Sequence, residues 1–319
     1  MLRTLSTLAR RWAAPAVPSR LRRRWRSLDA DRREFLGATL TARGYRVDGP
    51  SVTASLADHL VGRLTVFRRE VVPWLADAVP LDGATVLEIG CGTGSSTVAL
   101  AEQGAQVIGV DILPDRVDVA RTRCAAYDLR CELHVANAVD VSSIVDGRDV
   151  DLVVFFAALE HMTLDERLAA MRGTWAMLRP GGHWCLVDTP NRLWVFDGHT
   201  SVLPFFHWLP DELAVAYMRH SPRAELAGAW SEVTPESVEE LARHGRGISY
   251  HEFEVAIGPL AGLDVVSDLA GYRERHSAAR RLLRTWRPAH RVERVLRRAG
   301  PPVHPGFYTE SLDLVLRKP

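Results

Sequence analysis

Between residues 86 and 97 an apolar run passes into a glycine-rich turn and then into hydroxyl-bearing residues. The turn places Glu88, Gly90, Gly92 and Gly94 at alternate positions, and Ser95 follows. Glycines at such a turn let backbone N–H groups converge on a ligand without side chains in the way. This strand, turn and helix start predict a binding site for a nucleotide-like ligand.

Polar residues also follow two later apolar runs. Asp111 closes the second run, 21 residues after Gly90, where a carboxylate can accept hydrogen bonds from both hydroxyls of a ribose. Asn137 and Ala138 follow the third run, where the edge of an adenine would lie. A nicotinamide-dependent oxidoreductase is one reading, but the dinucleotide pattern G-x-G-x-x-G requires glycine at position 95, where Ser95 stands.

Four segments in order resemble class I S-adenosylmethionine-dependent methyltransferases, in the form seen in ubiquinone-type enzymes of small-molecule and glycan pathways. Segments 86–97 and 107–111 are similar to the first and second motifs of that family. Segment 149–162 is similar to its fourth motif, and 178–182 to the turn after the motifs. The resemblance covers about residues 83–190.

This resemblance implies S-adenosyl-L-methionine as the cofactor. It places the methionine end at the backbone of Gly90 and Gly92 with Glu88 nearby, the ribose at Asp111, and one adenine face against Ile112. The end of the fourth strand should lie beneath the reacting sulfonium. The expected cofactor-binding residues are Glu88, Gly90, Gly92, Gly94, Asp111, Ile112, Asn137, Ala138 and Phe156.

Three histidines are candidates for a general base, which would assist transfer to a hydroxyl by a factor of about 10²–10⁴. His161 follows the fourth strand, and His199 and His207 lie in an aromatic, proline-rich stretch after the fifth. A purely structural role is the alternative for each of them. Asp197 and His199 alone do not predict a metal site, because no further ligands follow at a recognisable spacing.

The expected function is methyl transfer to a hydroxyl, less favourably an amine, of a small molecule or sugar. An NAD(P)-dependent Rossmann oxidoreductase and a non-catalytic, S-adenosylmethionine-binding regulatory module are the alternatives. A net charge of +1 and the lack of a basic, aromatic strand platform argue against a nucleic-acid partner. The oligomeric state is not specified by these patterns.

Regular alternation of strands and helices predicts the fold. Apolar runs at 85–89, 106–110, 131–135, 151–156 and 183–187 are separated by helical stretches at 93–103, 114–127 and 164–178. This order indicates a Rossmann-like, doubly wound, mostly parallel seven-stranded sheet. Further predictions are a helix within 51–75 that packs on or covers this sheet, helices at 211–220, 235–244, 249–257 and 273–298, and strands at 263–269 and 307–316.

The first 28 residues hold eight arginines and no acidic residue, which leaves 32 basic against 39 acidic residues in the rest of the chain. We therefore expect a disordered basic leader and linker over 1–48, with weak membrane-surface association through 1–27 as one possible role. Residues 49–319 form the methyltransferase domain, divided into a cofactor-binding core (83–188), an acceptor lid (189–247) and a C-terminal portion (248–319). No apolar run reaches the length of a membrane span.

The cellular compartment is also an expectation from composition. Lys318 is the only lysine among 40 basic residues, a bias that points to a GC-rich bacterial gene and a cytoplasmic protein. The arginine-rich start also resembles a mitochondrial presequence, so the mitochondrial matrix is the alternative.

Overall fold

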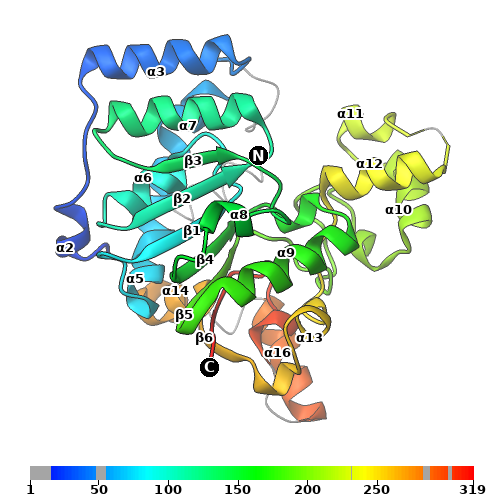
Figure 1. Cartoon of the computed structure of the whole chain (residues 1–319). Coiled ribbons are helices and arrows are strands. Elements are labelled where there is room, and N and C mark those ends of the chain that lie inside the picture. Colours follow the sequence, from blue (N-terminus) through cyan, green and yellow to red (C-terminus); the bar gives the residue numbers. More distant parts are fainter. Residues whose placement is uncertain (1–15, 48–54, 231, 283–287, 301–303) are drawn as a thin grey trace.

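The computed structural model describes residues 16–47, 55–230, 232–282, 288–300 and 304–319. A seven-stranded sheet with helices on both faces forms its centre (Figure 1). The strand order is β3-β2-β1-β4-β5-β7-β6, and β7 runs antiparallel to both of its neighbours. The predicted Rossmann-like, mostly parallel sheet is confirmed.

The strand bounds agree with the predicted ranges to within one residue, except that β5 begins earlier and β7 begins later than predicted. The strands are β1 (Thr85–Ile89), β2 (Gln106–Asp111), β3 (Glu132–Val135), β4 (Val150–Phe156), β5 (Leu178–Val187), β6 (Asp264–Asp268) and β7 (Leu314–Arg317). β5 begins five residues before the predicted 183, so the Pro180-Gly181-Gly182 turn lies within the strand and the N–H of Gly181 donates to Lys318 O. β7 is shorter than predicted, because residues 305–307 form a 3₁₀ turn.

Alternate residues of each central strand face opposite sides of the sheet, as the pleat requires. Val86 and Leu152 belong to one buried apolar cluster, whereas Leu87 and Val153 belong to the other. The flanking helices that cover these faces are α6 (Ser95–Ala101), α7 (Pro114–Ala126), α8 (Ser142–Val145) and α9 (Leu164–Met177). The strand order changes direction between β1 and β4, since β2 and β3 lie on one side of this pair and β5 lies on the other. Open α/β sheets bind ligands at such a switch point.

A long helix before β1 confirms the helix that was predicted within residues 51–75. It consists of η2 (Asp58–Gly62), α4 (Arg63–Val66), η3 (Phe67–Val71) and α5 (Val72–Ala78), where η2 and η3 have π-helical hydrogen bonding. Such wide turns are frequently found at functional sites. From η3, the ring of Phe67 meets that of Phe156 edge-on at 5.0 Å between centroids.

Residues 16–47 are folded against the core, so the prediction of a disordered leader over 1–48 is wrong for them. They form α2 (Ser19–Arg22) and α3 (Ala30–Ala42), and α3 packs Leu36 and Leu40 onto Val119 of α7 (Figure 1). Arg26 is also held, since its backbone N–H donates to Glu102 Oε1 at 2.7 Å. The segment is ordered despite its high positive charge, because α3 buries apolar side chains and Arg26 is bound to the core. The predictions for residues 1–15 lie outside the described residues.

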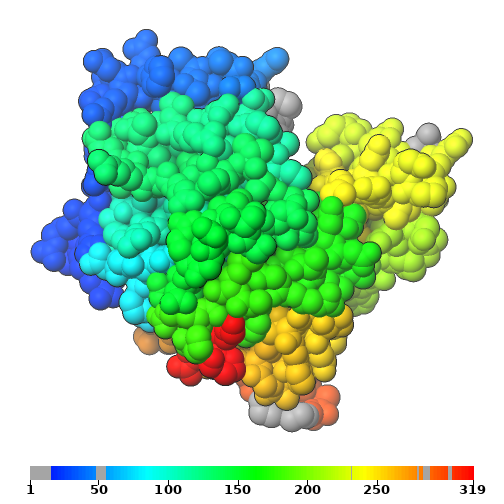
Figure 2. Space-filling view, viewed as in Figure 1, coloured from blue at the N-terminus to red at the C-terminus, as the bar shows by residue number. Residues whose placement is uncertain are grey.

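After β5 the chain builds a helical lobe, defined here as residues 203–230 and 232–245. It contains η5 (Phe206–Trp208), α10 (Asp211–Tyr217), η6 (Met218–His220), α11 (Ala224–Ala227) and α12 (Pro235–Gly245), which confirms the helices predicted at 211–220 and 235–244. The lobe has its own apolar cluster around Phe206. Figure 2 shows it projecting beyond the α/β core.

The C-terminal portion contains α13 (Glu252–Ala256), η7 (Leu260–Gly262), α14 (Leu269–His276), α15 (Ala278–Leu282), α16 (Pro288–Ala299) and η9 (Pro305–Phe307). The single helix predicted over 273–298 is therefore wrong, because α14 ends at His276 and the backbone of Ser277 is extended. Across the part of the chain that is described, no helix has both the length and the apolar character needed to cross a membrane.

Candidate active site and a neighbouring histidine cluster

The glycine turn lies between β1 and α6, at the switch point of the sheet. The backbone N–H groups of Gly90 and Cys91 both donate to Val110 O, at 2.9 and 3.0 Å. The N–H of Gly92 donates to the Asp111 carboxylate at 3.0 Å. The turn is thus tied to the end of β2, which brings the two sequence motifs together as predicted.

The three glycines of the turn all have positive φ, but they serve different purposes. A Cβ on Gly90 would lie 2.9 Å from Cβ of Ala158, and one on Gly94 would lie 2.9 Å from Cα of Ala120. These two glycines therefore permit close packing of the chain. At Gly92 a Cβ would meet no atom closer than 4.0 Å, and the residue faces open space.

Glu88 is fully buried and does not line the cavity beside the turn. Its carboxylate accepts hydrogen bonds from the hydroxyls of Ser96 and Thr97, the latter at 2.6 Å. Burial raises the pKa of Glu88 to about 7, although the two hydroxyls oppose this rise. In this structure Glu88 holds the first turn of α6 against β1.

The residues predicted to hold ribose and adenine lie together at the ends of β2 and β3. Besides Gly92, the Asp111 carboxylate accepts from the N–H of Leu113 at 2.9 Å. Ile112 is 61% exposed, which leaves an uncovered apolar side chain beside this acid. Asn137 Oδ1 accepts from the N–H of Val139 at 3.2 Å, so this residue also forms a local turn.

A cavity of about 780 Å³ opens beside the glycine turn, and Asp111 is not among its lining residues. Phe156 and the backbone of Gly90 and Gly92 line one end of it. The long helix before β1 and the C-terminal portion supply the other walls. None of the described residues from 189 to 247 is among its lining residues, so the prediction of an acceptor lid there is not met by this cavity.

Two lining residues have strained backbone at the ends of adjacent strands. Ala157 follows β4 with φ 43°, and Asp188 follows β5 with φ 58°. The N–H of Ala157 donates to Val187 O at 3.0 Å, which joins the two strand ends. Positive φ outside glycine costs energy and is concentrated at functional sites.

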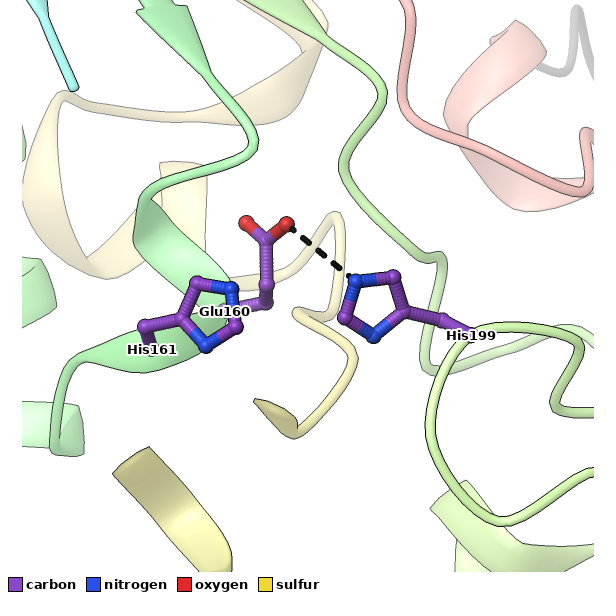
Figure 3. Close-up of side chains that lie close together, drawn as sticks. All are labelled: Glu160, His161 and His199. Atoms are coloured by element: carbon purple, nitrogen blue, oxygen red, sulfur yellow. Dashed lines mark ion pairs between the residues drawn. The ribbon is translucent and has the colours of Figure 1, made fainter. Parts of the chain in front are cut away.

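His161 and His199 lie close together beside Glu160, outside the lining of this cavity (Figure 3). Their ring centroids are 5.8 Å apart, and Nε2 of His199 is 3.9 Å from Oε1 of Glu160. Burial lowers the pKa of both imidazoles, that of His161 to about 4, and raises the pKa of Glu160 to about 8.

His207 does not belong to this cluster and is buried within the protein. Its Nδ1 accepts from the N–H of Gly247 at 3.2 Å, and its Nε2 lies 3.2 Å from Oδ1 of Asp197. Burial opposes ionisation of Asp197, but His207 and the N–H groups of Thr200 and Ser201 outweigh this effect and lower its pKa. In this structure His207 fixes the segment after β5 and does not reach the cavity.

The cavity also contains polar residues that the sequence patterns did not single out. Asp188, Asp268 and Asp313 contribute carboxylates, and Tyr308 contributes a phenol. The position of Asp188 directly after β5 was a usable signal, because ligands bind at the carboxyl ends of parallel strands. No comparable pattern marks Asp313, which enters the site through the return of the chain into β7.

Residues 86–182 match a family model described as a methyltransferase domain. Together with the sheet and the glycine turn, this match supports a class I S-adenosylmethionine-dependent methyltransferase domain in that part of the chain.

Individual relatives match less than half of the chain. The chain is 35% identical over 136 residues to a cypemycin N-terminal methyltransferase from Streptomyces sp, covering 42% of this chain and 54% of that protein. It is 35% identical over 119 residues to a ubiquinone biosynthesis O-methyltransferase from Xanthomonas campestris pv. campestris, covering 37% of this chain and 48% of that protein. The chain thus spans about half the length of these curated relatives. A magnesium protoporphyrin IX methyltransferase from Synechocystis, solved with bound SAM, shares 28% identity over 52% of this chain and 79% of its own, with a TM-score of 0.37.

Proposed function

We propose that this protein binds S-adenosylmethionine at the glycine turn and transfers its methyl group to a small acceptor in the adjoining cavity. The observation that carries the proposal is that Gly92 of this turn both binds Asp111 through its N–H and lines the cavity. A cofactor extended across the turn would have its ribose at Asp111 and its methionine end at the mouth of the cavity.

The residues at the turn fit such a cofactor. Gly92 offers open backbone where a side chain would intrude, and the Asp111 carboxylate keeps lone pairs beyond the two that its N–H donors use. The exposed side chain of Ile112 offers an apolar surface for a base. The expected contacts of Gly94 and Glu88 are less direct, because their positions serve packing and the start of α6.

When bound, S-adenosylmethionine supplies a methyl group that is activated by a positively charged sulfur. The chain must then hold the acceptor in line with that group, a contribution of about 7–11 kcal/mol at best. Phe156 and Phe67 provide a rigid aromatic wall next to Gly90, and Ala157 closes the floor between the strand ends. These elements position the acceptor and exclude water from the turn.

A polar, hydroxyl-bearing small molecule or sugar is the acceptor class that we favour. The cavity presents the carboxylates of Asp188 and Asp313 and the guanidinium of Arg63, groups that recognise hydroxyls. Burial, reinforced by the charge of Asp188, raises the pKa of Asp313 to about 6, so this carboxylate is mostly ionised at neutral pH and can accept a hydroxyl proton. The relatives include both an O- and an N-methyltransferase by name, and transfer to an amine is therefore the second candidate.

A labelled-methyl assay tests this proposal. The full chain is incubated with S-adenosylmethionine carrying a labelled methyl group and with panels of phenols, sugars and amines. Transfer to a hydroxyl compound, lost in the Asp111→Ala variant, is the expected result. Tight cofactor binding without transfer to any acceptor class would instead favour a regulatory module, and tighter binding of NAD would favour an oxidoreductase.

A further inference from the structure

Glu160 carries a buried carboxylate for which the proposed methyl transfer has no use. Its side chain is fully buried, and among the described residues neither carboxylate oxygen has a hydrogen-bond donor. The nearby Arg167 directs a guanidinium nitrogen to Glu252 at 3.5 Å. An unsatisfied carboxylate in such surroundings is costly and calls for a positively charged partner.

Two imidazoles face this carboxylate. One potential ligand atom from each of Glu160, His161 and His199 lies within 4.8 Å of the other two. Figure 3 shows both rings turned toward the carboxylate, His161 from the loop after β4 and His199 from the segment after β5. The separation of 3.9 Å between His199 Nε2 and Glu160 Oε1 is too long for a hydrogen bond.

Hydrogen bonds on the far side of each ring determine where its proton lies. Nδ1 of His161 is 3.0 Å from Arg243 O, a carbonyl that can only accept, so Nδ1 carries the proton. Nδ1 of His199 is 3.0 Å from the hydroxyl of Thr200, whose own proton is donated to Gly245 O at 2.8 Å. Nδ1 of His199 is therefore also the donor, and in both neutral rings Nε2 has a free lone pair.

With Glu160 ionised, the three groups thus present electron pairs to one another with no proton donor between them. We propose that Glu160, His161 and His199 bind one divalent transition-metal cation, with Zn²⁺ as the preferred ion. Zinc bonds to imidazole nitrogen and carboxylate oxygen are about 2.0–2.2 Å long, so one ion spans the 3.9 Å gap. Imidazole ligands favour such ions over Mg²⁺ and Ca²⁺, which prefer oxygen.

The surroundings match a built metal site. Ligating histidines commonly donate their second ring N–H to a carbonyl or another fixed acceptor, as His161 and His199 do here. A Cβ on Gly245 would lie 3.0 Å from Cε1 of His199 and 2.8 Å from the hydroxyl of Thr200. Glycine at this position therefore lets the His199 ring and its orienting hydroxyl lie against α12.

The ion would join two parts of the fold. Glu160 and His161 belong to the α/β core, whereas Arg243 and Gly245, which orient the histidines, belong to α12 of the helical lobe. Three protein ligands would leave a further coordination position open. The side chain of His199 is 35% exposed. Sequence spacing could not reveal the site, because its ligands come from two distant segments.

Metal binding to the untagged full chain, stripped with a chelator, tests this inference. Zn²⁺ is measured by competition with a chromophoric chelator, and Co²⁺ by the visible absorption of a nitrogen- and oxygen-ligated ion. We expect one tight site that a large excess of Mg²⁺ does not compete for. Glu160→Gln and His199→Ala should abolish it, and Thr200→Val should weaken it by about 10–100-fold.

The matched control is His134→Ala, since His134 forms an exposed pair with Glu132 at 2.8 Å but has no second histidine. This variant should bind one equivalent like the original chain, and circular dichroism should show that all variants are folded. Absence of a stoichiometric site, or equal loss in the control, would overturn the inference. Because the assay needs neither methyl donor nor acceptor, its outcome is independent of the proposed methyl transfer.

Discussion

The backbone N–H of Asp188 donates a hydrogen bond of 2.6 Å to the carboxylate of Asp313. This contact joins the end of β5 to the residue that precedes β7, and both residues line the cavity. Asp188 has a positive φ of 58° at this position. The arrangement puts a buried carboxylate of raised pKa on the acceptor side of the glycine turn.

If Asp313 accepts the proton of a hydroxyl acceptor, kcat/KM should depend on its ionisation. Its pKa of about 6 means that activity should fall about tenfold per pH unit below pH 6, as the carboxylate becomes protonated. Asp313→Asn should lower kcat by about 10²–10⁴ and remove this acidic limb. Initial rates from pH 5 to 8 measure both effects, with Asp264→Asn on the exposed edge of β6 as the control. An unchanged limb in Asp313→Asn would contradict the assignment.

Glu88 should make the folded state less stable as pH rises. Its pKa in the folded protein, about 7, lies above its ordinary value of 4.5, so the folded state binds this proton more tightly than the unfolded state does. The unfolding free energy should therefore fall between pH 4.5 and 7, by at most about 1.4 kcal/mol per pH unit. Urea unfolding at several pH values should show this slope reduced in Glu88→Gln and retained in Glu254→Gln, a change of an exposed residue on α13. A slope in Glu88→Gln equal to that of the original chain would exclude this cause.

Arg246 should contribute strongly to the stability of the helical lobe. Its buried guanidinium donates to Phe206 O at 2.9 Å and Leu209 O at 2.7 Å, and it also contacts Asp211. Arg246→Met would leave two carbonyls without these donors, each at a cost of about 1–3 kcal/mol. Thermal unfolding should show a clearly lower melting temperature for Arg246→Met than for the original chain.

Arg243→Met on α12 is the matched comparison, because Arg243 forms exposed ion pairs with Glu166 and Glu239. Such surface pairs contribute about 0–1 kcal/mol. Equal melting temperatures for the Arg246 and Arg243 variants would show that the buried contacts of Arg246 do not matter.

The α/β core was predictable because its signals are local. Each buried strand is a short apolar run, and Pro114 at the first position of α7 has no N–H that the helix would need. The order of strands and helices then restricts the topology. The glycine turn and Asp111 were predictable for the same reason, since adjacent parallel strands end at one edge of the sheet.

The remaining features depend on contacts between distant segments. Residues 16–47 fold because Leu36 and Leu40 pack against Val119. The high arginine content of this segment gives no indication of that contact. The cavity wall comes from α14, α16 and the long helix before β1. The sequence had instead predicted that the aromatic stretch after β5 would cover the acceptor. His161 follows β4 and His199 follows β5. Their proximity could therefore be predicted only after the two strands had been paired in the sheet.

Calorimetric titration of S-adenosylmethionine and S-adenosylhomocysteine into the full chain tests the central claim most directly. We expect both to bind at a single site. Asp111→Ala should weaken binding by about 10–100-fold, the loss of charge-assisted hydrogen bonds of about 1.5–3 kcal/mol. Asp115→Ala, which removes an exposed carboxylate of α7 paired with Arg43, should bind normally. Failure of the folded chain to bind either compound, or unchanged affinity in Asp111→Ala, would contradict the account.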